Sequence, residues 1–174
     1  EDGAAGLPVS AVSDRRATCA RKAGVTVDMA EYTAGRAQGL DLYCQPARAF
    51  AVGSKGQTYH GVCGGPGEAE FSAAYQAGRQ LFDLEQQVAN IEDDLRQARS
   101  DLRDVEQYIT DAEAGLIAPD TTVEARVQLV ADLKTFSEDK GNIETAIVAL
   151  NRDQVRAERE LREYRDSLAA SGQY

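Results

Sequence analysis

An apolar residue recurs, alternately three and four positions apart, along the whole stretch from Ala74 to Leu116. The residues of this seam are Ala74, Ala77, Leu81, Leu84, Val88, Ile91, Leu95, Ala98, Leu102, Val105, Ile109, Ala112 and Leu116. A repeat that averages about 3.5 residues keeps one stripe of a helix facing a partner helix, which is the pattern of a coiled coil. The seam therefore predicts a long helix, over about residues 68–115, that packs lengthwise against a second helix.

A second seam follows a short break at Ala118-Pro119-Asp120. Its apolar members are Leu129, Leu133, Phe136, Ile143, Ile147, Leu150, Ala157, Leu161, Tyr164 and Leu168, with Lys140 and Gln154 as interruptions. Thr121 with Glu124 three residues later is typical of a helix start, so the second helix is expected over about residues 121–169. A short loop between arms of similar length predicts an antiparallel hairpin over residues 67–174, the alternative being that each arm pairs with another chain.

Residues 1–66 have a different pattern and are expected to form a separate small head domain. Helix signals predict two short helices, over about residues 14–23 and 29–43. Two short apolar runs around Gly53-Ser54-Lys55-Gly56 predict a β-hairpin over about residues 49–62. The expected fold is therefore mainly α, with a small disulfide-bearing α+β head followed by a long antiparallel two-helix coiled-coil hairpin.

The chain contains three cysteines, Cys19, Cys44 and Cys63. Cys44 and Cys63 bracket the expected β-hairpin, whose closure would bring their chain segments together, so a Cys44–Cys63 disulfide is the preferred pairing. Cys19 is then free, while a bond from Cys19 to Cys44 or to Cys63 remains an alternative. No metal site is expected, because the cysteines form no CxxC pair and the single histidine, His60, is an unproven fourth ligand.

The run Tyr32-x-Ala34-Gly35-Arg36 recurs as Tyr75-x-Ala77-Gly78-Arg79. We interpret the repeat as helix packing, in which the glycine admits a neighbouring backbone and the arginine pairs with an acid or a carbonyl group. If the head binds a ligand, the best polar candidates are Arg36, Arg79, Tyr32 and Tyr59.

The formal net charge of −10 is concentrated in the expected hairpin. Residues 1–66 hold seven Lys/Arg and six Asp/Glu, whereas residues 67–174 hold twelve and twenty-three. An acidic surface repels phosphate backbones and anionic lipids, so binding to nucleic acid or to a membrane surface through the helices is not expected. No residues combine as nucleophile, base and acid, so the protein is expected to be no enzyme and to need no cofactor.

The head also carries a pattern of glycines, tyrosines and cysteines. Its members are Cys19, Gly24-Val25, Asp28, Tyr32, Gly35-Arg36, Gly39-Leu40, Tyr43-Cys44-Gln45-Pro46, Gly53, Gly56, Tyr59 and Gly61-Val62-Cys63. This pattern resembles a family of proteobacterial envelope lipoproteins described only as domain of unknown function 2799, and the resemblance covers about residues 1–80. It implies a periplasmic protein, anchored to the outer membrane by a lipid. Because Glu1-Asp2-Gly3 resembles the middle of an upstream motif, we expect an N-terminally truncated chain that lacks this lipid anchor.

The function expected from these features is non-enzymatic: a structural spacer, or a module that binds a protein partner in the cell envelope. The partner is expected to meet the hairpin tip, at Leu116, Ile117 and Val123, or an outer face at Phe82, Val127 and Val130. The off-seam apolar residues also suggest a homo-oligomer. The alternative function is a periplasmic binder of a small molecule or cell-wall fragment in a cleft of the head.

Overall fold

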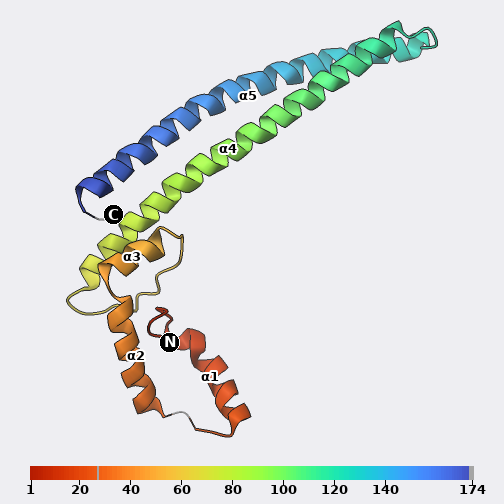
Figure 1. Ribbon diagram of the computed structural model, residues 1–174. Coiled ribbons are helices and arrows are strands. Elements are labelled where there is room, and N and C mark those ends of the chain that lie inside the picture. Colours follow the sequence, from red (N-terminus) through yellow and green to blue (C-terminus); the bar gives the residue numbers. More distant parts are fainter. Residues whose placement is uncertain (27, 173–174) are drawn as a thin grey trace. The chain divides into compact units, whose positions relative to one another are not determined.

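The protein is mainly helical in the residues that the computed structural model describes, which are 1–26 and 28–172, without the side chains of residues 12 and 14–16. This part of the chain contains no strand (Figure 1). Its helices are α1 (Val9–Ala23), α2 (Met29–Tyr43), α3 (Pro46–Gly53), α4 (Glu68–Ile117) and α5 (Val123–Ala170). The chain divides into two compact units, residues 1–85 with 161–174, and residues 86–160.

The prediction of a β-hairpin over residues 49–62 is wrong, because helix α3 covers residues 49–53 and loops cover the rest. Pro46 occupies the first turn of α3, where its fixed φ suits a helix and its missing N–H costs nothing. Ala49 and Val52, three residues apart, are both buried on one side of this helix. The apolar pattern there follows the helical period, and the alternation of Phe50 with Val52 was misleading.

The glycines that were expected to form the hairpin turn instead end α3. The N–H of Ser54 donates to the carbonyl oxygen of Phe50 at 2.8 Å, which closes the last helical turn. Gly56 then adopts a left-handed φ of 69°, and the ring of Phe82 lies where a side chain at Gly56 would stand. The chain continues to α4 as irregular structure.

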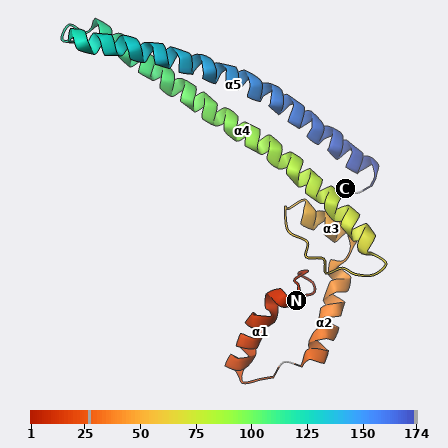
Figure 2. The same cartoon turned by 180° about the vertical axis from the view of Figure 1, so that it is seen from behind.

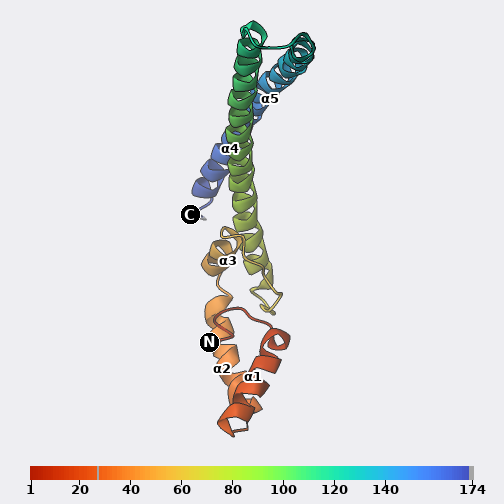
Figure 3. The same ribbon diagram turned by 90° about the vertical axis from the view of Figure 1, so that its right-hand side faces the viewer.

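Helix α2 covers the expected residues, whereas α1 begins earlier than expected, at Val9 instead of residue 14. Both helices are seen in Figure 3. The carboxylate of Asp28 caps α2 by accepting hydrogen bonds from the N–H groups of Ala30 (2.8 Å) and Glu31 (3.1 Å). Pro8 precedes α1 with an extended backbone, and Gly24 ends it in the left-handed conformation.

Two glycine contacts hold backbone segments of the first unit close together. A side chain at Gly78 of α4 would overlap the backbone of α3 at Phe50 and Gly53, and a side chain at Gly39 of α2 would overlap the N-terminal segment at Gly3. Gly35, in contrast, faces open space. The close approach that the repeated motif predicts is therefore present at Gly78, while in α2 it lies four residues later than Gly35.

The core of the first unit surrounds Phe71, whose side chain is fully buried. Its ring lies 4.7 Å from that of Tyr59 and 5.5 Å from that of Tyr43, measured between centroids. The Cys44–Cys63 disulfide, the preferred pairing, borders this core, and its Cα atoms are 5.5 Å apart. The bond joins the end of α2 to the loop before α4, and Cys19 is exposed and in no disulfide.

The first unit also contains the start of α4 and the end of α5, which lie against each other. The Tyr164 hydroxyl donates to the carbonyl oxygen of Ala77 at 2.9 Å, and Arg165 donates to the carboxylate of Glu85 at 2.7 Å. Leu161 and Leu168 of the α5 seam are buried. The two helices are antiparallel here.

The second unit is the remainder of the α4–α5 hairpin, in which α5 returns alongside α4 (Figure 2). Lys140, an interruption of the second seam, pairs across the hairpin with Glu106 at 2.8 Å, and the rings of Tyr108 and Phe136 lie 5.6 Å apart. The expected helical hairpin is confirmed, and the ends of its arms differ from the expected ones by at most two residues. None of the helices in the described residues combines the length and apolar composition needed to cross a membrane.

Candidate functional site

The turn between α4 and α5 is held by one arginine of α5. The guanidinium of Arg126 donates to the carbonyl oxygens of Leu116 (2.6 Å), Ala118 (2.8 Å) and Thr121 (3.2 Å). The Thr121 hydroxyl donates to the carbonyl oxygen of Gly115 at 2.6 Å. The last carbonyl groups of a helix have no hydrogen-bond partner within the helix, and the helix end carries partial negative charge. A cationic donor at this place pairs with the carbonyl groups and offsets that charge. The turn is therefore a fixed structure.

Four aliphatic side chains around this turn are exposed to solvent, and we call them the tip surface. Their exposed fractions are 83 % for Ile117, 73 % for Val123, 66 % for Val127 and 58 % for Val130. The three valines follow one another at spacings of four and three residues, so they lie on one face of α5. Two of the predicted tip residues, Ile117 and Val123, belong to this surface.

The third predicted tip residue, Leu116, is half-buried and contributes its carbonyl oxygen to Arg126. Phe82, which was expected on an outer face, is also half-buried. Its ring packs beneath the guanidinium of Arg79, whose carbon lies 5.0 Å from the ring centroid. Phe82 is therefore a packing residue of the first unit.

Two members of the tip surface, Ile117 and Val123, lie in a stretch of chain without basic residues. Residues 104–125 contain no Lys, Arg or His, and their six acids are Asp104, Glu106, Asp111, Glu113, Asp120 and Glu124. Arg126 follows at once, but its guanidinium is occupied by the carbonyl groups of the turn. Ile117 and Val123 thus have an acidic setting. This gap in the basic residues could have been found in the sequence beforehand.

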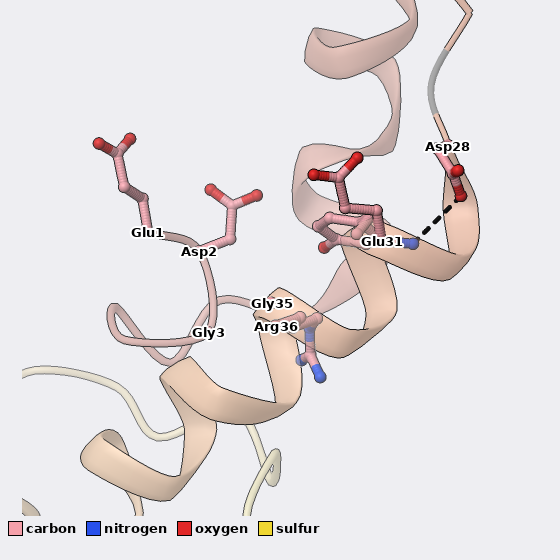
Figure 4. A pocket seen from close by; sticks show the side chains of 8 residues that line it. Glu1, Asp2, Gly3, Asp28, Glu31, Gly35 and Arg36 are labelled. Carbon is pink, nitrogen blue, oxygen red and sulfur yellow. Dashed lines mark hydrogen bonds between the residues drawn. The ribbon is translucent and has the colours of Figure 1, made fainter.

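Arg36 and Tyr32, two of the predicted ligand residues, line a cavity of about 330 Å³ at the start of α2 (Figure 4). Four carboxyl side chains line the same cavity, those of Glu1, Asp2, Asp28 and Glu31. In Figure 4 the guanidinium of Arg36 points away from the carboxylates of Glu1, Asp2 and Glu31. It donates to the carbonyl oxygen of Leu7 at 3.1 Å, so Arg36 anchors the N-terminal segment to α2.

Tyr59 and Arg79, the other two predicted ligand residues, lie elsewhere in the first unit. The hydroxyl of Tyr59 accepts a hydrogen bond from the backbone N–H of Cys63 at 2.9 Å. The backbone N–H of Tyr59 donates to the hydroxyl of Tyr75 at 3.3 Å. Arg79 pairs with Asp83 one turn later on α4, at 2.9 Å. The four candidates do not converge on one site: Tyr32 and Arg36 share one cavity, whereas Tyr59 and Arg79 lie elsewhere.

A different cleft of the head, which sequence reasoning missed, has basic and neutral polar side chains in its lining. We call it the head cleft, and its volume is about 470 Å³. Its polar side chains come from Tyr43, Arg48, Gln57, Thr58 and His60, and its apolar ones from Ala5, Leu7 and Val52. Burial raises the pKa of the Tyr43 hydroxyl, as does Tyr59, while the nearby Arg48 acts in the opposite direction. No acidic residue lines this cleft.

Comparison with known proteins gives a family match for the N-terminal part of the chain. No curated protein and no solved structure matches the chain. Residues 1–80 match the family described as "Protein of unknown function (DUF2799)". The matched residues include the disulfide and the lining of the head cleft, whereas the tip surface lies beyond them. By this match, residues 1–80 are similar to a domain family of unknown function.

Proposed function

We propose that this chain is a non-enzymatic protein of the bacterial envelope that binds a protein partner, or spaces envelope components, through its helical hairpin. The observation that carries the proposal is the tip surface, where four aliphatic side chains stand exposed beside a turn that Arg126 holds in one conformation. Exposed apolar residues that gather at one place are typical of interaction sites. A fixed turn lowers the entropy cost of binding because little has to be ordered.

The charge around the tip surface supports a basic partner. Docking would bury Ile117 and the three valines, and acids such as Asp120 and Glu124 would border the contact. An apolar segment flanked by Lys and Arg fits this arrangement, because opposite charges speed association and discriminate against wrong partners. A second copy of the same tip would bring like charges together, so we favour a different protein over a homo-oligomer.

For the location we propose the periplasm, with a lipid anchor in the outer membrane of a proteobacterium. The Cys44–Cys63 disulfide supports an oxidising compartment, since such bonds are rare in the reducing cytosol. The resemblance of residues 1–80 to envelope lipoproteins supports the anchor.

Site-specific photo-cross-linking in cells tests the proposal. A photoreactive amino acid replaces Ile117 in one strain and Asn142, which is exposed on α5 outside the tip surface, in a control strain. We expect one protein to be captured from Ile117 and not from Asn142, and mass spectrometry to locate the cross-link in a segment rich in Lys and Arg. Equal capture from both positions, or capture of a second copy of this chain alone, would contradict the proposed partner.

Substitution of the tip surface gives a second measurement. The double variant Ile117→Ser, Val123→Ser should lose the captured partner and keep its thermal stability, because both side chains are already exposed. Val148→Ser is the matched control, since Val148 is an exposed valine of α5 outside the tip surface. Binding that survives the double variant would count against the tip.

Small-molecule binding in the head is a second candidate function, and the head cleft is the observation that favours it. A ligand site formed by Arg36 and Tyr59 together is not supported, because the two side chains line no common cavity within the described residues and both form hydrogen bonds with backbone groups.

A further inference from the structure

We infer that the head cleft is a binding site for a small ligand that carries an oxyanion, a carboxylate or phosphate group. This inference goes beyond the proposed docking function and does not rest on it, because the tip surface belongs to the other unit. The cleft supports it by the charge of its lining, the availability of its donors, the rigidity of its walls and its size.

The lining of the cleft differs in charge from the chain as a whole. The formal net charge of the chain is −10, and the cavity at the start of α2 has four carboxyl groups in its wall. The head cleft has Arg48 and His60 in its lining and no acid. A cavity of this kind attracts anions and, with no carboxylate in its wall, does not repel them.

The basic side chains of the cleft are available to a ligand. Arg48 and His60 are both exposed, and neither forms an ion pair or a side-chain hydrogen bond within the described residues. By contrast, Arg79, Arg126 and Arg165 are occupied by carboxylates or carbonyl groups. A guanidinium presents a planar set of donors that matches the two oxygens of a carboxylate or phosphate. Arg48 is therefore the expected anion ligand, with His60, Gln57 and Thr58 as further polar groups.

The cleft lies against the buried core of the head. Its floor includes Tyr43 and Val52, which are 3 % and 5 % exposed, and the Cys44–Cys63 disulfide begins at the next residue after Tyr43. The loop that carries the polar residues is fixed at Gln57, whose N–H donates to the carbonyl oxygen of Val52 at 3.1 Å and whose carbonyl accepts from Tyr75 at 3.0 Å. Such a site needs little rearrangement when a ligand enters.

The N-terminal segment also lines the cleft, through Ala5 and Leu7, and its backbone is held by contacts to α2. Arg36 donates to the carbonyl oxygen of Leu7, and Gly6 adopts a left-handed φ of 67° against the ring of Tyr43. A side chain at Gly6 would overlap that ring. Arg36, which the sequence suggested as a ligand residue, is on this reading a positioning residue for Leu7.

The size of the cleft selects a small ligand. A volume of about 470 Å³ lies within the range of pockets that hold small molecules, roughly 300–1,000 Å³. Leu7, Val52 and the Tyr43 ring provide an apolar side, while Arg48 provides the charge. This combination fits an oxyanion attached to a small ring or aliphatic body.

Titration of the ¹⁵N-labelled full chain, followed by NMR, tests the inference. The probes are benzoate, inorganic phosphate and benzamide, which has the shape of benzoate without its charge. We expect saturable shifts at Gln57, Thr58 and His60 with benzoate or phosphate, and at least about tenfold weaker binding of benzamide than of benzoate, as expected for loss of one charged hydrogen-bonded contact. Tighter binding of benzoate assigns the site to a carboxylate with an apolar body, and tighter binding of phosphate assigns it to a free inorganic anion.

Arg48→Gln should weaken benzoate or phosphate binding about tenfold, a loss of one charge-assisted contact. Lys55→Gln removes the same charge from an exposed position nearby that does not line the cleft, and should change affinity less than about twofold. His60→Gln serves as a second variant if Arg48→Gln unfolds. The inference is overturned by the absence of saturable shifts up to about 10 mM of either anion, by equal binding of benzamide and benzoate, or by equal losses in Arg48→Gln and Lys55→Gln.

Discussion

The guanidinium of Arg126 donates a hydrogen bond of 2.6 Å to the carbonyl oxygen of Leu116, ten residues earlier in the chain. Leu116 is the last member of the α4 seam, so this bond ties the end of one arm to the first turns of the other. The same guanidinium reaches Ala118 and Thr121, and these contacts bracket the whole turn. Ile117 and Val123 lie at the two ends of this turn, and both side chains are exposed.

Replacing Arg126 with Ala should lower the free energy of unfolding by about 2 kcal/mol, because hydrogen bonds to a half-buried charged group are lost and the carbonyl groups at the end of α4 lose their partner. Chemical denaturation measures this change. Hydrogen exchange should accelerate first at the turn. Arg99→Ala is the control, since Arg99 is exposed on α4 with no ion pair in the described residues. Equal losses in the two variants would show that the contacts to the turn contribute nothing.

Glycine substitutions should have opposite effects at two positions in the long helices. Gly78→Ala should destabilise the protein by about 2–3 kcal/mol, because the added Cβ would overlap the backbone of α3. Gly141→Ala should stabilise it by about 1 kcal/mol, since that position in α5 faces open space and Ala is the better helix former. Thermal and denaturant unfolding measure both. A stable Gly78→Ala variant would mean that α3 and α4 do not cross at this point.

The same contrast within α2 tests the N-terminal segment. Gly39→Ala should separate residues 3 and 4 from the helix and loosen the wall of the head cleft, whereas Gly35→Ala, one turn earlier, should be neutral or stabilising. NMR shifts of Ala5 and Leu7 report the separation directly. If Gly35→Ala perturbs these residues as strongly as Gly39→Ala, the assignment of the close contact to Gly39 is wrong.

The disulfide should contribute about 3 kcal/mol, because it closes a loop with a sequence separation of 19 residues in the unfolded chain. The double variant Cys44→Ala, Cys63→Ala should lose this amount in denaturant unfolding, and the wild type should lose it in the presence of a reductant. Cys19→Ser should change nothing, since Cys19 is exposed and in no disulfide. A reductant effect that persists in the double variant would point to another bond.

The long helices could be predicted from the sequence, because a repeat sustained from Ala74 to Leu116 leaves few other structures open. The segment from Phe50 to Val62 could not. That segment has few apolar residues, so its pattern does not distinguish a strand from a helix. Phe50 and Val52 also fit a short helix that begins at Pro46. The predicted pairing of Cys44 with Cys63 is confirmed, but the reason given for it was wrong. Helix α3 and the loop after it bring the two cysteines together, where a β-hairpin was expected to do so.

The head cleft could not be predicted for the same reason. Arg48 was expected just before a strand, whereas it lies on α3. His60 lies on the loop after α3, and this loop lines the cleft with a turn at Gly56 and a hydrogen bond from Tyr75 to the Gln57 carbonyl. Contacts of this kind join residues far apart in the chain and leave no local pattern. The exposure of all four residues of the tip surface could be predicted, because Ile117 and Val123 stand beside a recognisable break and Val127 and Val130 lie off the α5 seam. The role of Arg126 in closing the turn is visible only in three dimensions.

Ionisation of Tyr43 should lower the free energy of unfolding of the head at alkaline pH. Burial, the larger cause, and the nearby Tyr59 raise the pKa of its hydroxyl above the ordinary value of 10.0. Below that value the phenol is protonated in both the folded and the unfolded chain, so its contribution to stability is fully present. As the pH rises above it, the unfolded chain ionises first, and the free energy of unfolding falls until the folded protein also titrates. Tyr43→Phe should reduce this alkaline decline, and the ultraviolet absorbance of tyrosinate should lose a component that titrates above the ordinary tyrosine range. A decline and an absorbance titration that are unchanged in Tyr43→Phe would place the alkaline sensitivity elsewhere, with Tyr164, whose pKa burial also raises, as the next residue to replace.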